Sequence, residues 1–442
     1  MNAPTGRRWG AQTQLAVENF PISDERMPMP VIRAIAAIKS EAAGVNADAG
    51  VISREMADAI IGAADEVAAG SMDDQFPVDV FQTGSGTSTN MNVNEVVAHR
   101  ASELLGLPVH PNDHVNRSQS SNDVFPTAVR IAAATMVTFE LVPTLEMLRT
   151  TLLVLADRYA DTVMLGRTHL MDAVPMTFGQ QAAGWARGVQ LGGDRLGGVL
   201  TRLCELPLGG TAVGTGLNAP AGFGARTAER LGARTGLTLR EAADHVEAQS
   251  SQDVLLETSA ACRSAVLTLH KLAGDLRLLG SGPIGGLGEL HLPALQAGSS
   301  IMPGKVNPVI PEVVQQVAAQ VVGNDAAITF AMTASMLQLN TAMPVIARNL
   351  LQSLTLTHRA ARVLDEKCLR GLEVDAARMR RAAEGSSALV TALTPTHGYD
   401  VAASLVRRMA ETGRSLAEVA TDEGVTGVDE IDLLAMAKPH QV

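Results

Sequence analysis

A short stretch in the second half of the chain carries several groups that can do chemistry together. Residues 298–308 read Gly-Ser-Ser-Ile-Met-Pro-Gly-Lys-Val-Asn-Pro, which places two hydroxyls, an ammonium and an amide between glycines and prolines. Glycine allows close backbone approach, and the prolines keep the stretch out of a helix, so such a loop is suited to holding an anion. The spacing is not that of a phosphate loop, because five residues separate Gly298 from Gly304 and Val306 follows Lys305. We therefore expect a carboxylate rather than a triphosphate.

Three further polar stretches precede this loop. Residues 83–95 begin Thr-Gly-Ser-Gly-Thr, residues 110–123 end Ser-Ser-Asn-Asp, and residues 166–175 contain Arg-Thr-His. Together with the loop at 298–308, they resemble the signature segments of the fumarase/aspartase superfamily and are most similar to those of class II fumarases. The resemblance covers nearly the whole chain. It implies an all-α, three-domain fold whose long central helical bundle forms the core of a homotetramer, with active sites shared between subunits.

The two hydroxyls of the loop have both a structural and a chemical interpretation. An isolated Gly-Ser-Ser is more often a turn. Lys305 and Asn307, however, place two donors beside the hydroxyls, and these donors can bind one carboxylate. A hydroxyl held there can take a carbon-bound proton if backbone N–H groups stabilise its alkoxide. The resemblance makes Ser299 the catalytic base, and it makes Ser300, Lys305 and Asn307 the ligands of a substrate carboxylate.

A histidine follows a threonine in the 166–175 stretch. A lone histidine is more often a hydrogen-bonded structural residue than a catalyst, but Thr168 can bind a carboxylate oxygen while His169, oriented by an acidic partner, activates or delivers water. By resemblance, Glu312 matches the carboxylate that pairs with this histidine. Its alternative role is that of an ordinary carboxylate in the first turn of a helix.

Two hydroxyl-rich segments are expected to contact the substrate as well. Ser120, Ser121 and Asn122 can cap a helix that begins around Pro126, and the same free N–H groups and hydroxyls make a carboxylate cradle. Residues 85–87 read Ser-Gly-Thr, which is either a glycine turn or, by resemblance, a substrate contact made by Ser85 and Thr87.

Two other segments have weaker assignments. His110, Asn112 and Asp113 resemble the accessory dicarboxylate site of fumarases, although Leu107 stands where some members have arginine. Residues 209–218 are rich in glycine, but no βαβ unit surrounds them, and they resemble a family segment that lies near the active site. No cluster has metal-ligand spacing, and the resemblance implies that no cofactor is required.

Helices must position all of these groups. Aromatic residues make up 3% of the 442 residues and apolar residues 46%, which favours helices packed by small and aliphatic side chains. Helical stripes appear at Leu145–Tyr159, at Leu255–Leu279, and after Pro311 with an end near Gly323–Asn324. Breaks rich in glycine, proline and asparagine separate these helical runs. We predict an N-terminal domain at 1–119, a central bundle at 120–376 and a small helical domain at 377–442.

Charge and cysteine usage limit the partners and the compartment. The net charge is −11, no Lys/Arg cluster occurs and no apolar run reaches membrane-spanning length, so neither nucleic acid nor membrane is expected as a partner. Cys204, Cys262 and Cys368 lie in apolar helical patterns, as reduced core thiols do. The first ten residues lack the apolar segment of a secretory signal, so a cytoplasmic location is expected.

The resemblance implies reversible hydration of fumarate to L-malate by anti addition and elimination. The alternative is an aspartate ammonia-lyase or related succinate-type lyase. Residues 83–87, 120–122 and 303–305 are typical of fumarases, whereas 292–297 and 337–340 are more typical of aspartases. A third hypothesis is a helical oligomer with a structural role alone. The complete set of polar residues argues against it, because a scaffold has no need of them.

Overall fold

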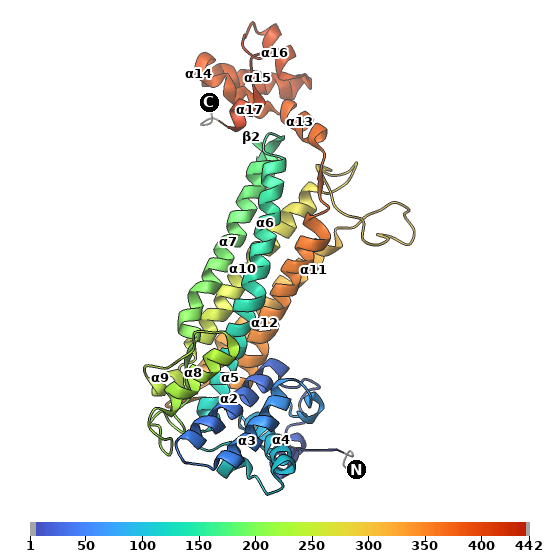
Figure 1. The fold of residues 1–442 in the computed structure, drawn as a ribbon. Coiled ribbons are helices and arrows are strands. Elements are labelled where there is room, and N and C mark those ends of the chain that lie inside the picture. The colour runs from blue at the N-terminus through green and yellow to red at the C-terminus, as the bar shows by residue number, and fades with distance from the viewer. Residues whose placement is uncertain (1–5, 439–442) are drawn as a thin grey trace. The chain divides into compact units, whose positions relative to one another are not determined.

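The computed structural model describes residues 6–438, whose ribbon is drawn in Figure 1. Helices make up most of this part of the chain and strands only a little, which confirms the predicted all-α class. The α-helices are α1 (Ala11–Asn19), α2 (Met29–Asp48), α3 (Arg54–Ala68), α4 (Thr87–Leu105), α5 (Ser121–Met136), α6 (Val142–Arg158), α7 (Phe178–Leu203), α8 (Phe223–Thr235), α9 (His245–Ser250), α10 (Asp253–Leu279), α11 (Val309–Ala331), α12 (Met343–Leu364), α13 (Ala376–Glu384), α14 (Thr394–His397), α15 (Tyr399–Thr412), α16 (Leu416–Asp422) and α17 (Leu433–Ala437).

Short helices and strands connect these elements. The 3₁₀ and π segments are η1 (Asp73–Gln75), η2 (Pro111–Val115), η3 (Val137–Leu141), η4 (Met332–Ala334), η5 (Asp365–Leu369) and η6 (Ser387–Ala392). The strands form two-stranded pairs only: β1 (Val163–Thr168) with β2 (Met171–Thr177), β3 (Glu205–Leu206) with β4 (Arg240–Glu241), β5 (Leu290–His291) with β8 (Glu373–Val374), and β6 (Ser335–Met336) with β7 (Leu339–Asn340).

The packing divides the described chain into two compact units that interleave along the sequence. Unit 1 contains residues 6–143, 192–266 and 317–359, and unit 2 contains the remaining residues up to 438. Helices α7, α10, α11 and α12 each contribute residues to both units.

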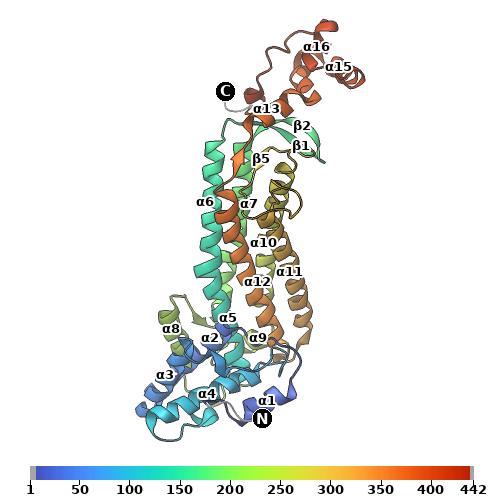
Figure 2. The ribbon, with the colours of Figure 1, turned by 90° about the vertical axis from the view of Figure 1, so that its right-hand side faces the viewer.

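Helix α2 is the centre of packing in unit 1. It packs against α3, α5 and α8, and α3 packs in turn against α4 (Figures 1 and 2). Fourteen of its twenty residues are buried, because isoleucine, valine and alanine occupy most sides of the helix rather than one stripe. Any polar side chain in the middle of α2 must therefore find its partners inside the protein.

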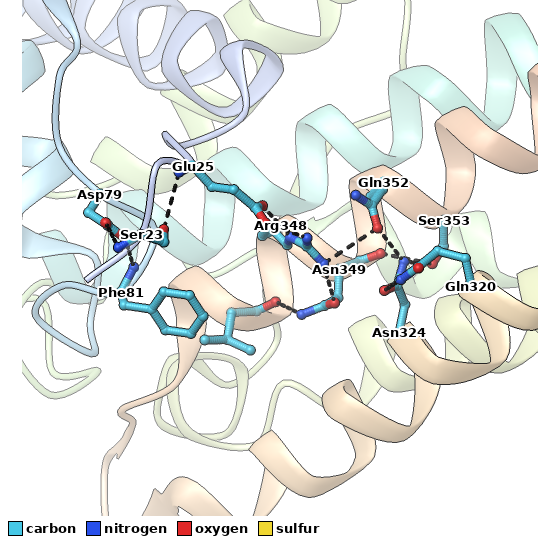
Figure 3. Close-up of polar contacts among 11 residues, drawn as sticks. Ser23, Glu25, Asp79, Phe81, Gln320, Asn324, Arg348, Asn349, Gln352 and Ser353 are labelled. Atoms are coloured by element: carbon cyan, nitrogen blue, oxygen red, sulfur yellow. Dashed lines mark hydrogen bonds and ion pairs between the residues drawn. The ribbon is translucent and has the colours of Figure 1, made fainter. Parts of the chain in front are cut away.

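Figure 3 shows a polar network that ties α12 to other parts of unit 1. Arg348 donates from Nε and Nη2 to the two carboxylate oxygens of Glu25, each at 2.7 Å, and this lowers the pKa of Glu25. One turn further along α12, the Asn324 amide donates to Gln352 at 2.9 Å and to Ser353 at 3.1 Å. These bonds join α11 to α12 within the unit.

The same network corrects one sequence prediction. Helix α11 begins at Val309, before Pro311, and it continues to Ala331 rather than ending near Gly323–Asn324. Asn324 is buried and uses its amide on α12, so it does not cap the helix. The buried stripe is also narrower than predicted, because Val313 and Val322 are exposed. The predicted stripe at Leu255–Leu279 is confirmed, since Leu255, Cys262, Leu269, Leu272, Leu276 and Leu279 are buried in α10. The stripe at Leu145–Tyr159 is confirmed for Leu145, Leu148, Leu152 and Leu155 in α6, whereas Tyr159 follows the helix and is half-buried.

A β-hairpin and the C-terminal helices form the other core, in unit 2. Strands β1 and β2 pair antiparallel (Figure 2), and they pack against α13 and α17. Val163 and Leu165 of β1 join an apolar cluster with Leu389, Leu405 and Val419. The hairpin is thus fixed at its base by buried side chains, while the residues of its turn are exposed.

One helical segment is long and apolar enough, by length and composition alone, to meet the criteria for a membrane span. It runs from Ser121 to Arg158, has a mean hydropathy of 1.4 in its most apolar window, and has 56% of that window buried inside the chain. A core helix passes the same test by composition alone, and α5 packs against α2 in this way.

The three cysteines are free and buried, as predicted. Burial raises the pKa of the Cys262 and Cys368 thiols to about 12, so both are inert thiols at neutral pH. Within residues 6–438, no group of three or more His, Cys, Asp or Glu side chains is arranged to hold a metal ion.

Candidate active site

The loop that precedes α11 is closed at its base by two hydrogen bonds. Gly298 N–H donates to the carbonyl of Lys305 at 3.0 Å, and the Asn307 amide donates to the carbonyl of Gly298 at 2.7 Å. A Cβ at residue 298 would lie 2.1 Å from the Lys305 oxygen, so only glycine fits there. The closed base brings Ser299, Lys305 and Asn307 into one small loop.

Ser299 has the environment that a hydroxyl base needs. Its Oγ accepts hydrogen bonds from the backbone N–H groups of Ile301 at 3.2 Å and Met302 at 3.1 Å. Both donors would stabilise an alkoxide on this oxygen. A hollow of about 400 Å³ lies beside it, lined by residues 294–299 and 302–306. Ser300 and Lys305 are exposed, and Asn307 is half-buried.

The turn of the β1–β2 hairpin presents Thr168 and His169. Both residues are exposed, and positive φ angles of 57° at His169 and 61° at Leu170 form the tight turn between paired Thr168 and Met171. Among residues 6–438, no side chain or backbone group forms a hydrogen bond or ion pair with the His169 ring. The expected acidic partner is therefore not supplied within the described chain.

Arg167 anchors the strand that leads into this turn. Its guanidinium pairs with the Glu289 carboxylate through two contacts, one of them 3.0 Å between Nη1 and Oε2. The Glu289 side chain is 2% exposed, so this is a buried ion pair. Such a pair holds the backbone before Thr168 in a fixed place.

Glu312 lies in the first turn of α11, as expected of a helix N-terminal carboxylate. Its Oε1 lies 3.8 Å from Arg277 Nη2, and Arg277 also donates to Gln315. The carboxylate thus faces α10 in the described chain, and it makes no bond to His169.

The hydroxyl segment 120–122 forms the beginning of α5. The helix starts at Ser121 and contains Pro126, which corrects the expected start around Pro126. Ser120 is the N-cap: its Oγ accepts from Asn122 N–H at 3.3 Å, and its own N–H donates to Asp123 at 2.9 Å. The reciprocal bonds of this capping box fix the start of α5 at Ser121, whereas the sequence indicated only a possible cap at residues 120–122.

Asp123 also ties this segment to the glycine-rich loop at 209–218. Its Oδ2 accepts from the N–H groups of Gly209 at 3.1 Å and Thr211 at 2.9 Å, while the Asn122 amide donates to the Ala212 carbonyl at 2.8 Å. Burial raises the pKa of Asp123 to about 6, against the opposing effect of these N–H donors. The loop therefore supports the cradle by packing and hydrogen bonds.

Ser85 and Thr87 approach the same cradle in unit 1. Their hydroxyls share a hydrogen bond of 2.8 Å at the beginning of α4, and a Cβ on Gly86 between them would strike the ring of Phe125. The Asn90 amide of α4 donates to Ser121 Oγ at 3.0 Å. The structure thus brings residues 85–87 and 120–122 together.

The predicted site residues fall into two groups. Those of unit 1 are Ser85, Thr87, Ser120, Ser121 and Asn122, and those of unit 2 are Thr168, His169, Ser299, Ser300, Lys305, Asn307 and Glu312. Each group contains donors that could bind a carboxylate, and only the second contains Ser299 and His169.

The proposed accessory segment uses its histidine locally. His110 Nδ1 accepts from the N–H groups of Asn112 at 3.3 Å and Asp113 at 3.1 Å, and so caps the short helix η2. Leu107, which replaces an arginine of some family members, is exposed. The segment remains exposed, with His110 engaged in its own turn.

Three buried charges near the site were missed by sequence reasoning. Lys39 is fully buried in α2, Arg130 donates to the carbonyls of Glu205 and Ala248 from α5, and Glu289 holds Arg167. Burial lowers the pKa of Lys39 to about 7 and that of Arg130 to about 10. A charged residue inside an otherwise apolar helical run was the available signal for Lys39 and Arg130.

Comparison with known proteins places this chain in a family. Residues 1–323 match the family model described as lyase, and residues 389–438 match that of the fumarase C C-terminus. The class II fumarate hydratase of Mycobacterium tuberculosis (strain H37Rv) is 48% identical, covering 100% of this chain and 95% of the relative. That of Corynebacterium glutamicum is 47% identical, covering 99% and 94%.

Solved structures agree. The class II fumarase from Schistosoma mansoni superposes with a TM-score of 0.97 at 38% identity, covering 100% of this chain and 98% of that one. The fumarate lyase:delta crystallin from Brucella melitensis bound to cobalt gives a TM-score of 0.94 at 41% identity, covering 99% and 97%. With family models matched over most of its length and relatives at nearly half identity throughout, the chain belongs to the fumarase/aspartase superfamily, in its class II fumarase branch.

Proposed function

We propose that the protein is a fumarate hydratase, a hydro-lyase that interconverts fumarate and L-malate. One observation carries the proposal: Ser299 Oγ accepts two backbone N–H groups inside a closed loop that also holds Lys305 and Asn307. A serine becomes a base for a carbon-bound proton only where its alkoxide is stabilised in this way. The full-length relatives at 46–48% identity, all named class II fumarate hydratases, support the same reaction.

The elimination of water from malate assigns a role to each residue. The Ser299 alkoxide takes the proton from the carbon next to one carboxylate, and the electrons of that C–H bond move into the carboxylate to give an aci-carboxylate. Lys305 and the second N–H of Asn307 stabilise the added charge. The C–O bond then breaks as His169 gives a proton to the departing hydroxyl, which releases water and fumarate.

The remaining residues hold the substrate. Ser300 and Thr168 donate hydroxyls to its carboxylates. The unit 1 group of Ser85, Thr87, Ser120, Ser121 and Asn122 provides a second carboxylate cradle at the start of α5, where backbone N–H groups and the helix dipole favour an anion. His110, Asn112 and Asp113 form the accessory dicarboxylate site in this proposal, and no step of the reaction depends on them.

The proposal includes a homotetramer whose active sites are shared between subunits. Family members act as oligomers, and two features of this chain favour sharing. Glu312 pairs with Arg277 and leaves His169 without a described partner, so the Glu312 that orients this histidine comes from another subunit. The apolar residues beside the hairpin turn, Leu170, Met171 and Val174, are exposed in the single chain and need covering.

We also propose three domains, at 1–119, 120–376 and 377–442. The match of residues 389–438 to the fumarase C C-terminus supports a separate C-terminal domain. Three free thiols and the charge of −11 fit a reducing, cytoplasmic compartment and a small dicarboxylate partner rather than nucleic acid or membrane.

Residues 337–340, one of the two segments more typical of aspartases, form the turn and second strand of the β6–β7 hairpin. Asn340 is buried, donates to Ala331 and Ser335, and accepts from Ala342 N–H at 2.7 Å, so it shapes the β6–β7 hairpin. Leu337 forms the exposed turn of that hairpin with a φ of 53°.

The test is the ultraviolet absorbance of fumarate during incubation of the purified protein with L-malate and, separately, with L-aspartate. Fumarate formed from malate alone is the expected result. Fumarate and ammonia formed from aspartate would replace the proposal with the ammonia-lyase alternative. Absence of both reactions would exclude the two dicarboxylate functions.

A further inference from the structure

A lysine lies completely inside unit 1, next to the cradle. Lys39, in the middle of α2, has no exposed surface, although its helical neighbours are isoleucine and alanine. Burying an amine without partners is costly, and here the cost is offset by two hydrogen bonds. Nζ donates to Asn116 Oδ1 at 2.7 Å and to Gln119 Oε1 at 3.1 Å. Both acceptors belong to the turn that leads directly into Ser120.

These contacts fix the direction of a hydrogen-bond chain. Because Lys39 donates, Asn116 must present its carbonyl oxygen to it. The same oxygen accepts from Asn90 Nδ2 at 3.3 Å, so Asn90 presents its amino group, and that group also donates to Ser121 Oγ at 3.0 Å. Asn90 Oδ1 is left buried without a hydrogen-bond partner among the described residues. The reverse orientation of Asn90 would place its oxygen against that of Asn116.

The hydrogen-bond chain ends at the Ser121 hydroxyl and determines whether that hydroxyl donates or accepts. Ser121 Oγ accepts a hydrogen bond from Asn90, so the hydroxyl proton of Ser121 is not used in that bond. The proton is available to an acceptor outside this hydrogen-bond chain. If Asn90 were reversed, Ser121 would donate to Asn90 and present only a lone pair to an anion. A carboxylate requires the donor arrangement.

We propose that Lys39 is a positioning residue, which acts through Asn116 and Asn90 to keep the Ser121 hydroxyl a donor to a substrate carboxylate. The proposal rests on the proposed function only in taking a dicarboxylate as the ligand. It gives the buried amine a task that an apolar side chain of the same volume cannot perform, and it makes the energetic effects of Lys39 and Ser121 on binding dependent on each other.

A double-mutant cycle on ligand binding tests this dependence. Succinate, a saturated dicarboxylate that cannot be hydrated, is titrated by calorimetry into the intact protein, Lys39→Met, Ser121→Ala and the double variant. We expect Lys39→Met to weaken succinate binding about tenfold, the loss of about one charge-assisted hydrogen bond. In the Ser121→Ala background, Lys39→Met should change succinate binding less than twofold. In turnover, Lys39→Met should raise KM by a similar factor and change kcat much less.

A second cycle covers the case in which Lys39→Met does not fold. Asn90→Ala breaks the same chain at its middle and should also weaken succinate binding only when Ser121 is present. Asn92→Ala is the matched control, because Asn92 is equally buried in α4 but donates to the Gln75 carbonyl instead. It should leave succinate binding unchanged even if it lowers the thermal midpoint.

The outcomes separate the two proposals. Equal losses with and without Ser121, or no loss in Lys39→Met, would overturn the role of Lys39 while leaving the hydratase function intact. No binding of succinate by the unaltered protein would overturn the role of Lys39, and the malate assay alone would then decide the proposed function. If the protein turns over malate but the effects of the Lys39 and Ser121 substitutions are independent, the proposed function is retained and the role of Lys39 is overturned.

Discussion

Gly298 and Lys305 join the two ends of the loop at 298–308, since the N–H of Gly298 donates to the carbonyl of Lys305 at 3.0 Å. The approach is so close that a Cβ on residue 298 would lie 2.1 Å from that oxygen. Gly298→Ala should therefore open the loop and separate Ser299 from Lys305. We expect kcat/KM to fall about 100-fold or more, as misplacement of catalytic groups by about 1 Å does. Steady-state kinetics and thermal unfolding measure this, and the midpoint should change little because the loop is largely exposed.

Gly304→Ala is the control for the loop. Gly304 has a φ of 78°, but no atom lies within 4 Å of where its Cβ would stand. The substitution costs about 1–2 kcal/mol of backbone strain without a collision. An effect on kcat/KM equal to that of Gly298→Ala would show that the closing bond is not what positions the loop.

Ser299→Ala removes the proposed base and leaves the carboxylate donors in place. We expect kcat to fall about 10³-fold or more, while the dissociation constant for succinate changes less than about threefold, since the hydroxyl acts mainly in the transition state. Size-exclusion chromatography should show an unchanged assembly. Ser281→Ala is the comparison, because Ser281 Oγ also accepts a backbone N–H, from Leu287 at 3.1 Å, in a glycine-rich turn. Residual turnover above about one per cent in Ser299→Ala would remove Ser299 as the base.

The Arg167–Glu289 pair should stabilise unit 2 and hold the His169 turn. Glu289→Ala leaves the mostly buried Arg167 guanidinium without its carboxylate, and breaking a buried pair costs about 3–5 kcal/mol. Chemical denaturation at fixed protein concentration measures the free energy of unfolding. Glu257→Ala is the control, since its pair with Arg202 is exposed and should contribute about 0–1 kcal/mol. Similar losses of unfolding free energy in Glu289→Ala and Glu257→Ala would mean that the buried Arg167–Glu289 pair stabilises the fold no more than an exposed pair does.

Local chemistry explains which features could be predicted from the sequence. Apolar spacing predicted α6 and α10, and glycine, proline and hydroxyl residues located the loop at 298–308, because these signals depend on neighbours in the sequence. The end of α11 could not be predicted, since Asn324 is held inside the helix by Gln352 of α12. The role of Lys39 depends on Asn116, 77 residues away. Partners of this kind are visible only after folding.

The start of α5 shows the same limit on prediction from the sequence. A cap at residues 120–122 was predicted from residue types, but the start of α5 at Ser121 depends on the reciprocal bonds between Ser120 and Asp123. The anchoring of Asp123 to Gly209 and Thr211, nearly 90 residues away, had no local signal. Residue types therefore indicated the kind of site, and distant contacts determined its geometry.

Lys39 should make the stability of the protein depend on alkaline pH. Burial lowers its pKa in the folded state to about 7 from an ordinary 10.5, with Asp123 opposing the shift. Between these values the unfolded chain binds the proton and the folded chain releases it, so stability rises with pH and is lost as pH falls toward 7. Relative to Lys39→Met, the unaltered protein should gain up to about 1.4 kcal/mol per pH unit in this window.

Denaturation of both proteins at pH 7, 8 and 9 measures that difference. Asp123 does not affect this comparison, because its pKa is raised from 3.8 to about 6. Its contribution to the free energy of unfolding therefore changes with pH only below the range of pH 7 to 9. Lys271→Met is the matched control, since Lys271 is exposed beside Asp275, and its difference from the unaltered protein should stay flat. A flat difference for Lys39→Met as well would mean that Lys39 keeps its proton in the folded protein throughout this range, with Asp123 and the two amide oxygens outweighing the cost of burial.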